Sequence, residues 1–145
     1  MDAATPQYVG FWARVIACLI NTVIIGIPLW ILMKILGIEL DFAGSMETLE
    51  AQMDRVQTIQ VILSAAFFIG LWLVTQTDPG KMAFGAVIVD AKTGGKPTTL
   101  QYVLRYLGYI VSTLPLGLGF FWIGWDARKQ GFHDKIAGTV VVKKA

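Results

Sequence analysis

Three long apolar stretches dominate the pattern of hydrophobic and polar positions along the chain. The first two, residues 11–33 and 56–75, contain only a few polar side chains. A helix needs about 20 apolar residues to cross about 30 Å of hydrocarbon, so each stretch predicts one complete transmembrane helix. The third stretch, residues 102–125, is broken near its middle by the sequence PLGLG at 115–119. It therefore predicts a helix that is interrupted by Pro and Gly.

The segments around these stretches carry patterns of their own. Five apolar or amide side chains recur at helical spacing from the acidic linker into the second stretch: Met46, Leu49, Met53, Val56 and Gln60. With Ser45 as N-cap, they predict one continuous helix that projects beyond the bilayer. Two β-branched runs, residues 84–90 and 139–143, predict strands that pair into a ribbon. The expected fold is a single all-α membrane domain over residues 1–145, with two full transmembrane helices, a broken third segment and a small cytoplasmic two-stranded β ribbon.

The composition agrees with a membrane protein and excludes several other classes. Hydrophobic residues make up 55% of the chain and charged residues only 15%, against about a quarter charged in soluble domains. The net charge of +2 is too small for a surface that follows nucleic-acid phosphates. We therefore exclude a soluble enzyme, a disordered tail and a nucleic-acid-binding module as first interpretations.

Charged residues in the connecting segments predict the orientation. Residues 35–58 contain five acidic side chains and one arginine, whereas the loop 76–101 and the tail after Trp125 carry an excess of lysine and arginine. Because basic loops stay in the cytoplasm, we expect the N-terminus, this loop and the tail to be cytoplasmic. A simple third crossing would put the basic tail outside. We therefore favour a re-entrant hairpin for residues 102–125, and the alternative is one tilted, Pro-kinked span.

Four stretches of the sequence resemble the RDD family of bacterial multi-pass membrane proteins. YVGFWARVIACLIN at 8–21 is similar to the opening of that family, and TDPGKMAFGAVIVD at 77–90 is similar to its loop signature. RYLGYIVSTLP at 105–115 and RKQGFHDKIAGTVVV at 128–142 resemble its closing half. The resemblance implies a location in the bacterial inner membrane.

The chain departs from the family pattern at two positions that matter for function. The family is named after one Arg and two Asp in its membrane segments, and Arg14 matches the Arg. Asn21 and Ser112 stand where the family usually has Asp, whereas Asp134 in the tail motif is kept. Both intramembrane carboxylates are therefore expected to be missing.

Arg14 is the first candidate for a functional residue, because a charge inside a span costs at least about 2.5 kcal/mol unless it pairs or reaches the headgroups. It shares a helix face with Asn21, so it either snorkels or points into the bundle. We hypothesise that Arg14 or Arg105 pairs with Asp134 and docks the tail on the helices. A structural clamp is favoured over a transported-ion site. The complete candidate cluster comprises Arg14, Asn21, Arg105, Ser112, Asp126, His133 and Asp134.

Other motifs give little support to catalysis. His133 is the only histidine, and we interpret it as a local hydrogen-bonding residue instead of a proton relay or a metal ligand. The loop motif Asp78, Pro79, Gly80 and Lys81 contains Gly-Lys without the rest of a P-loop, and it predicts a tight turn. We expect no enzyme activity, no cofactor and no metal site.

Three function classes remain open. The favoured one is a membrane scaffold or partner protein, with a homo-oligomer as one form, because Ala13/Ala17 and Ala66/Gly70 are small-residue pairs that let helices approach. The alternative is a transporter of a small ion or solute, by cation or proton exchange, which acts as an oligomer and which has been proposed for members of the family. The third is a lipid-facing role in which the basic tail holds anionic headgroups.

Overall fold

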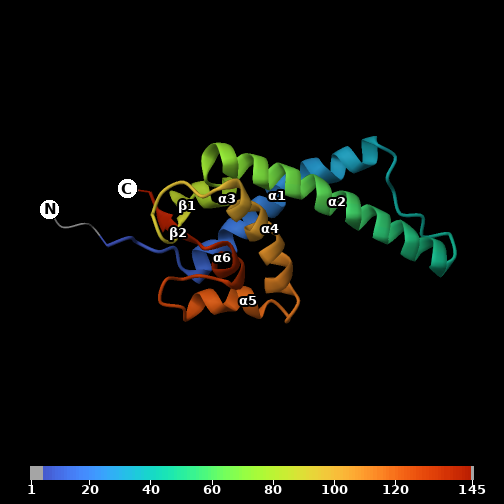
Figure 1. Ribbon diagram of the computed structural model, residues 1–145. Helices are drawn as coiled ribbons and strands as arrows, with labels where there is room; N and C mark the ends of the chain where they lie inside the picture. Colours follow the sequence, from blue (N-terminus) through green and yellow to red (C-terminus); the bar gives the residue numbers. More distant parts are fainter. Residues whose placement is uncertain (1–4, 145) are drawn as a thin grey trace.

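Two long helices, joined by a linker, make up the first half of the chain. The computed structural model describes residues 5–144, and its first helices are α1 (Phe11–Ile35) and α2 (Met46–Thr75) (Figure 1). Both are long and apolar enough to cross a membrane. At the start of α2 the side chain of Ser45 accepts a hydrogen bond from the backbone N–H of Thr48. The continuous helix predicted from the linker into the second span is therefore confirmed.

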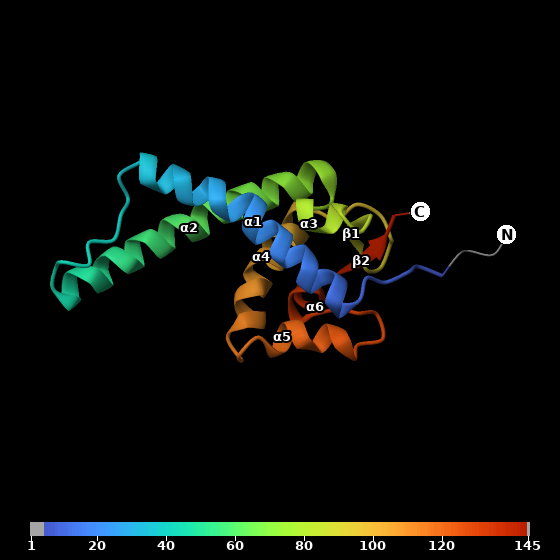
Figure 2. The same cartoon turned by 180° about the vertical axis from the view of Figure 1, so that it is seen from behind.

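The two spans bury very little of their surface. Only Arg14, Ala17 and Met33 are buried in α1, and only Trp72 is buried in α2. The helices diverge toward the linker that joins them, as both views show (Figures 1 and 2). Their apolar side chains therefore face outward, where lipid or other membrane helices would contact them.

The third apolar segment is a bent pair of helices. It consists of α4 (Thr99–Thr113), the short α5 (Leu118–Phe121) and a 3₁₀ turn, η1 (Trp122–Gly124), and the two arms are bent by 110°. Gly117 lies at the bend with φ +78°, a left-handed conformation that glycine adopts without steric cost. The predicted interruption of this segment by Pro and Gly is confirmed.

After the bend the chain returns to the end of the molecule from which it came. Four residues beyond η1, the guanidinium of Arg128 donates a hydrogen bond of 2.6 Å to the carbonyl oxygen of Ala91, in the loop before α4. Both ends of the bent segment therefore lie at the same end of the molecule (Figure 2). This arrangement favours the hairpin interpretation over one kinked span, which would carry its two ends apart.

A small antiparallel ribbon joins the loop after α2 to the C-terminal tail. Strand β1 (Ala86–Asp90) pairs with β2 (Thr139–Lys143) from Ala86↔Lys143 to Asp90↔Thr139. The predicted ribbon is thus confirmed, but β1 begins two residues later than expected because Gly85 turns the chain at φ +60°. The patterns of the sequence did not predict a further bridge between Tyr8 and Val142, which adds the N-terminal segment to the other edge of β2.

Two short helices flank the ribbon and complete the core. They are α3 (Pro79–Met82), in place of the predicted tight turn, and α6 (Phe132–Ala137), which packs along α4. The buried apolar core where these elements meet consists of Val9, Trp72, Ala86, Ile88, Tyr102 and Val141. The buried apolar core of the protein therefore lies at the ribbon end, away from the linker.

Candidate functional site

A buried carboxylate connects the tail to two helices. Asp134 lies in the first turn of α6, where its Oδ2 accepts a hydrogen bond from the backbone N–H of Gly131 (3.0 Å). Arg14 Nη1 of α1 lies 2.5 Å from Asp134 Oδ2, and Arg105 Nη1 of α4 contacts Asp134 Oδ1. Arg105 also donates to the hydroxyl of Thr139 (2.8 Å). We call these four side chains, Arg14, Arg105, Asp134 and Thr139, the charge clamp.

Arg14 makes further contacts that fix its position. Its Nε donates to the carbonyl oxygen of Val9 (3.1 Å) and its Nη2 to that of Lys129 (2.7 Å). The side chain therefore points into the protein and does not snorkel to the headgroups. The hypothesis named either arginine as the partner of Asp134, and the structure places both arginines against it.

Electrostatics favour the ionised form of Asp134 despite its burial. Removal from water alone would raise the pKa of this carboxyl, but the guanidinium groups of Arg105 and Arg14 hold the pKa well below its usual range. Two arginines against one aspartate leave one excess positive charge. The guanidinium of Arg105 is completely buried and lies 5.7 Å from the ring centre of Trp72 and 5.8 Å from that of Tyr109. These aromatic faces stabilise the excess charge through cation–π contacts.

Asn21 and the loop motif form a second polar contact. Asn21 Nδ2 donates to Asp78 Oδ1 (2.7 Å), and its Oδ1 accepts from the backbone N–H of Gly80 (2.8 Å). Asp78 also pairs with Lys81 and caps α3. The indole of Trp72 approaches Asp78 Oδ2 at 3.4 Å. Asn21 thus fastens the α2–β1 connection to α1, with its amide donating and accepting at the same time. We call this set, Asn21, Trp72, Asp78, Gly80 and Lys81, the loop contact.

Ser112 and His133 form a third contact beside the charge clamp, where His133 Nε2 lies 3.5 Å from Asp134 Oδ2. Ser112 Oγ lies 3.2 Å from His133 Nδ1 and accepts from the backbone N–H of His133 (3.1 Å). The imidazole lies 4.4 Å from the ring centre of Tyr109 and 5.3 Å from that of Phe120. Burial lowers the pKa of His133 to about 3, so the ring is neutral at physiological pH. Gly119 allows α5 to approach this site, because a Cβ there would lie 2.5 Å from the Cα of Ser112.

Asp126 is the one candidate that does not join the others. Its carboxylate pairs with Lys135 (2.7 Å) and accepts from the backbone N–H groups of Arg128 and Gln130. It orders the turn between η1 and α6 and does not contact either buried arginine. Sequence reasoning also missed Thr139 and the position of Trp72, because a strand hydroxyl and a helix tryptophan give no local signal of the charge that they meet.

The polar residues are arranged for holding elements together. Each acid in the charge clamp and in the loop contact is already paired with a neighbouring base. Within residues 5–144, no three His, Cys, Asp or Glu side chains lie close enough together to hold a metal ion. The observed contacts can fix the tail, the loop and α1 relative to one another.

The comparison with known families decides what kind of protein this is. The RDD family matches residues 8–138, which include every helix from α1 to α6 and the first strand. The chain belongs to the RDD family. The resemblance is therefore confirmed, and the chain is a membrane protein with two or three candidate spans. The charge clamp joins three blocks of this RDD protein that the sequence had singled out.

Three relatives of the RDD protein extend the comparison. The uncharacterized protein RP437 of Rickettsia prowazekii (strain Madrid E) is 41% identical over 57% of this chain, but the match covers only 46% of that relative. The uncharacterized protein YxaI of Bacillus subtilis (strain 168) is 29% identical over 93% of this chain and 97% of its own. The uncharacterized membrane protein YteJ of Bacillus subtilis (strain 168) is 29% identical over 97% of this chain, and the match covers 84% of that relative. No solved structure matches the chain.

Proposed function

We propose that this RDD protein is a non-enzymatic membrane scaffold whose spans pack against other membrane helices. The observation that carries the proposal is the exposure of α1 and α2, which contact the rest of the protein through very few buried residues. Exposed side chains follow one face of α2 through Ile62, Ala66, Gly70 and Val74, and a Cβ at Gly70 would meet nothing within 4 Å. A face with small residues at its centre allows close approach of another helix.

The polar core supports a structural role for the same reason. A transported cation needs a carboxylate that can exchange partners, whereas Asp134 is held by two arginines and a backbone N–H. Asn21 and Ser112 are neutral, and their hydrogen bonds fasten the loop and α6. We propose that this core keeps the two diverging spans at a constant angle for their partners.

We further propose that both termini and the ribbon lie in the cytoplasm, with the acidic linker on the other side of a bacterial inner membrane. The proposal rests on the basic residues of the loop and tail together with the pairing of β1 and β2, which keeps those segments side by side. The bent α4–α5 segment is then a re-entrant hairpin. The residues at its bend, among them Leu114 and Leu116, are exposed in the single chain, so another membrane segment must cover the irregular backbone wherever it lies within the hydrocarbon.

Site-specific photo-crosslinking in the native membrane tests the scaffold. A photoreactive amino acid at Ile62, on the exposed α2 face, is expected to give one discrete crosslinked product, which is either a second copy of this chain or another membrane protein. The control places the same group at Phe42, which is 77% exposed in the linker, and is expected to give no such product. If Ile62 and the similarly exposed Val23 of α1 both yield only the uncrosslinked chain, the proposal is wrong.

Transport of a small ion by an oligomer is the second candidate. One observation favours it: ionised side chains of α1 and α4 are buried beside a bent helix pair, and interrupted membrane helices with such groups line the substrate sites of known transporter folds. Proteoliposomes loaded with Na⁺ or H⁺ gradients separate the two functions. The scaffold function predicts no flux above that of protein-free vesicles at several pH values, whereas a flux of Na⁺ or H⁺ through the wild-type protein would establish transport.

A further inference from the structure

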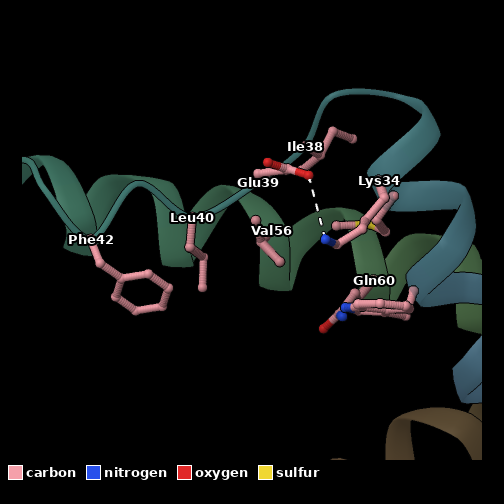
Figure 3. A pocket seen from close by; sticks show the side chains of 9 residues that line it. Lys34, Ile38, Glu39, Leu40, Phe42, Val56 and Gln60 are labelled. Carbon is pink, nitrogen blue, oxygen red and sulfur yellow. Dashed lines mark ion pairs between the residues drawn. The ribbon is translucent and has the colours of Figure 1, made fainter.

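A groove opens between the diverging ends of α1 and α2, far from the charge clamp. It has a volume of about 340 Å³, at the lower end of the range for small-molecule sites. Its apolar walls include Trp30 and Met33 of α1, Phe42 of the linker and Val56 of α2. Lys34 and Glu39 lie at its rim, and Figure 3 shows their side chains directed toward each other. The groove therefore combines an apolar floor with one positive and one negative group.

The position of this groove favours a lipid as its occupant. Trp30 and Lys34 lie in the last two turns of α1, where a span leaves the hydrocarbon, and such residues are typical of the headgroup level. The groove lies between two spans that diverge there, so an acyl chain can enter from the bilayer. The ammonium of Lys34 lies 5.0 Å from the ring centre of Trp30, which holds it at the rim.

The two rim charges are loosely paired and keep capacity for a ligand. Lys34 Nζ lies 3.8 Å from Glu39 Oε1, and the side chains are 53% and 63% exposed. An exposed pair at this separation contributes little on its own. Lys34 can therefore donate to a phosphate diester, while the Glu39 carboxylate accepts hydrogen bonds from an ammonium group.

We propose that this groove binds one phospholipid with a primary ammonium headgroup, of the phosphatidylethanolamine class. Its phosphate pairs with Lys34, its ammonium pairs with Glu39, and one acyl chain lies along Met33 and Val56. A quaternary choline headgroup has no N–H to donate to Glu39. A glycerol headgroup has no cation and leaves the carboxylate beside a second negative charge. The charge pattern of the rim thus selects among bilayer lipids.

Native mass spectrometry of the full chain in detergent tests the proposal. The protein is titrated separately with dioleoyl phosphatidylethanolamine, phosphatidylcholine and phosphatidylglycerol. We expect one tightly bound ethanolamine lipid per chain, with a preference over the other two of roughly tenfold, the size of one charge-assisted hydrogen bond at a partly exposed site. Glu39→Gln is expected to abolish the preference for the ethanolamine lipid. Lys34→Gln is expected to weaken the binding of all three lipids.

Matched controls make the result specific to the groove. Glu47→Gln removes an exposed acid of α2 outside the groove, and Lys92→Gln removes an exposed lysine at the ribbon end, so both are expected to bind like the wild type. Because Lys34 and Glu39 are exposed, their variants are expected to fold, which circular dichroism checks. The proposal is overturned if the wild type binds the three lipids equally, or if Glu39→Gln keeps the preference. It does not rest on the scaffold function, whose crosslinking test probes a different face.

Discussion

Asp134 links three elements through a single carboxylate. It is completely buried, it pairs with an arginine from α1 and another from α4, and it caps the helix that carries it. Removing one partner from a buried pair costs more than the pair itself contributes, because the remaining charge keeps its desolvation penalty. The stability of the polar core therefore depends on this residue more than on either arginine alone.

Replacing this carboxylate should weaken the fold strongly. Asp134→Asn keeps the shape of the side chain but leaves Arg14 and Arg105 without a negative partner, and we expect the free energy of unfolding to fall by about 3–5 kcal/mol. Unfolding of the purified protein in mixed detergent micelles, followed by circular dichroism, measures the change. Asp54→Asn, an exposed acid of α2, is the control and should change stability by less than about 0.5 kcal/mol. Equal stability of the two variants would disprove the charge clamp.

His133 should make the protein sensitive to mild acid. The pKa of this buried imidazole is about 3 in the folded protein, against 6.5 for an exposed histidine. Below pH 6.5 the unfolded chain takes up a proton and the folded chain does not, so stability is complete above pH 6.5 and decreases as the pH falls toward 3. Between pH 6.5 and 5 the expected loss is about 2 kcal/mol, from about 1.4 kcal/mol per pH unit.

The charged groups around His133 also affect its pKa, and so they affect the pH dependence of stability. Asp134 favours the charged ring, whereas Arg105, Arg14 and Lys81 oppose it. The pKa of Asp134 is lowered, so the stability that its ionised form contributes is lost only at still more acidic pH, below the usual range of a carboxyl. The variant His133→Asn should unfold with a much flatter dependence between pH 5 and 7, whatever its absolute stability. An unchanged slope would show that another group is responsible.

At the level of elements, close backbone contact fixes α1 against α3. A Cβ on Gly80 would lie 1.9 Å from the carbonyl oxygen of Ala17, so the two segments touch through their main chains. The small pair Ala13/Ala17 was expected to let another helix approach closely. In the structure, Ala17 is buried inside the protomer, whereas Ala66 and Gly70 stay exposed.

Two glycine variants should therefore have opposite effects. Gly80→Ala forces α1 away from α3 and is expected to destabilise the protein by about 1–3 kcal/mol, the usual cost of overpacking. Gly70→Ala meets open space within the last third of α2 and should stabilise the detergent-solubilised monomer by about 0.5–1 kcal/mol, because alanine favours the helix. Thermal unfolding in one detergent compares them directly. A loss of stability in both variants would contradict the packing described for α2.

At the level of the whole molecule, the paired ribbon requires the loop after α2 and the C-terminal tail to share one side of the membrane. With the exposed Cys18 replaced by Ser, a single new cysteine can be probed in intact cells with a membrane-impermeant maleimide. Glu47→Cys in the linker half of α2 should react, and Lys144→Cys after the ribbon should react only once the cells are permeabilised. Labelling of Lys144→Cys in intact cells would refute the proposed orientation.

Much of the fold could be predicted because its signals are local. Apolar length predicts α1 and the membrane part of α2, Ser45 and the helical spacing behind it predict the extension of α2, and PLGLG at 115–119 predicts the break. Each depends on residues within one or two turns of one another. The N-terminal bridge to Val142 and the helix α6 lack such signals, since the first is a single pair and the second is stabilised by its packing on α4.

The candidate site was predictable in its members but not in its pairing. A charge inside an apolar stretch must find a partner, and this rule identified Arg14 and Arg105, whereas the tail motif of the family resemblance supplied Asp134 as the expected partner. The same rule placed Asp126 among the possible partners, but Asp126 pairs with Lys135 instead. Helical phase gives the face and depth of each side chain, and it does not say which faces meet.

The sequence by itself thus determined the membrane class, the order of the elements and the residues that needed partners, because hydrocarbon excludes uncompensated polar groups wherever they stand in a fold. Only the tertiary structure decided that both arginines share one carboxylate, that Asn21 fastens the loop at Gly80, and that α1 and α2 diverge. These outcomes depend on distances between segments that are remote in the chain, and the packing of the complete molecule sets such distances.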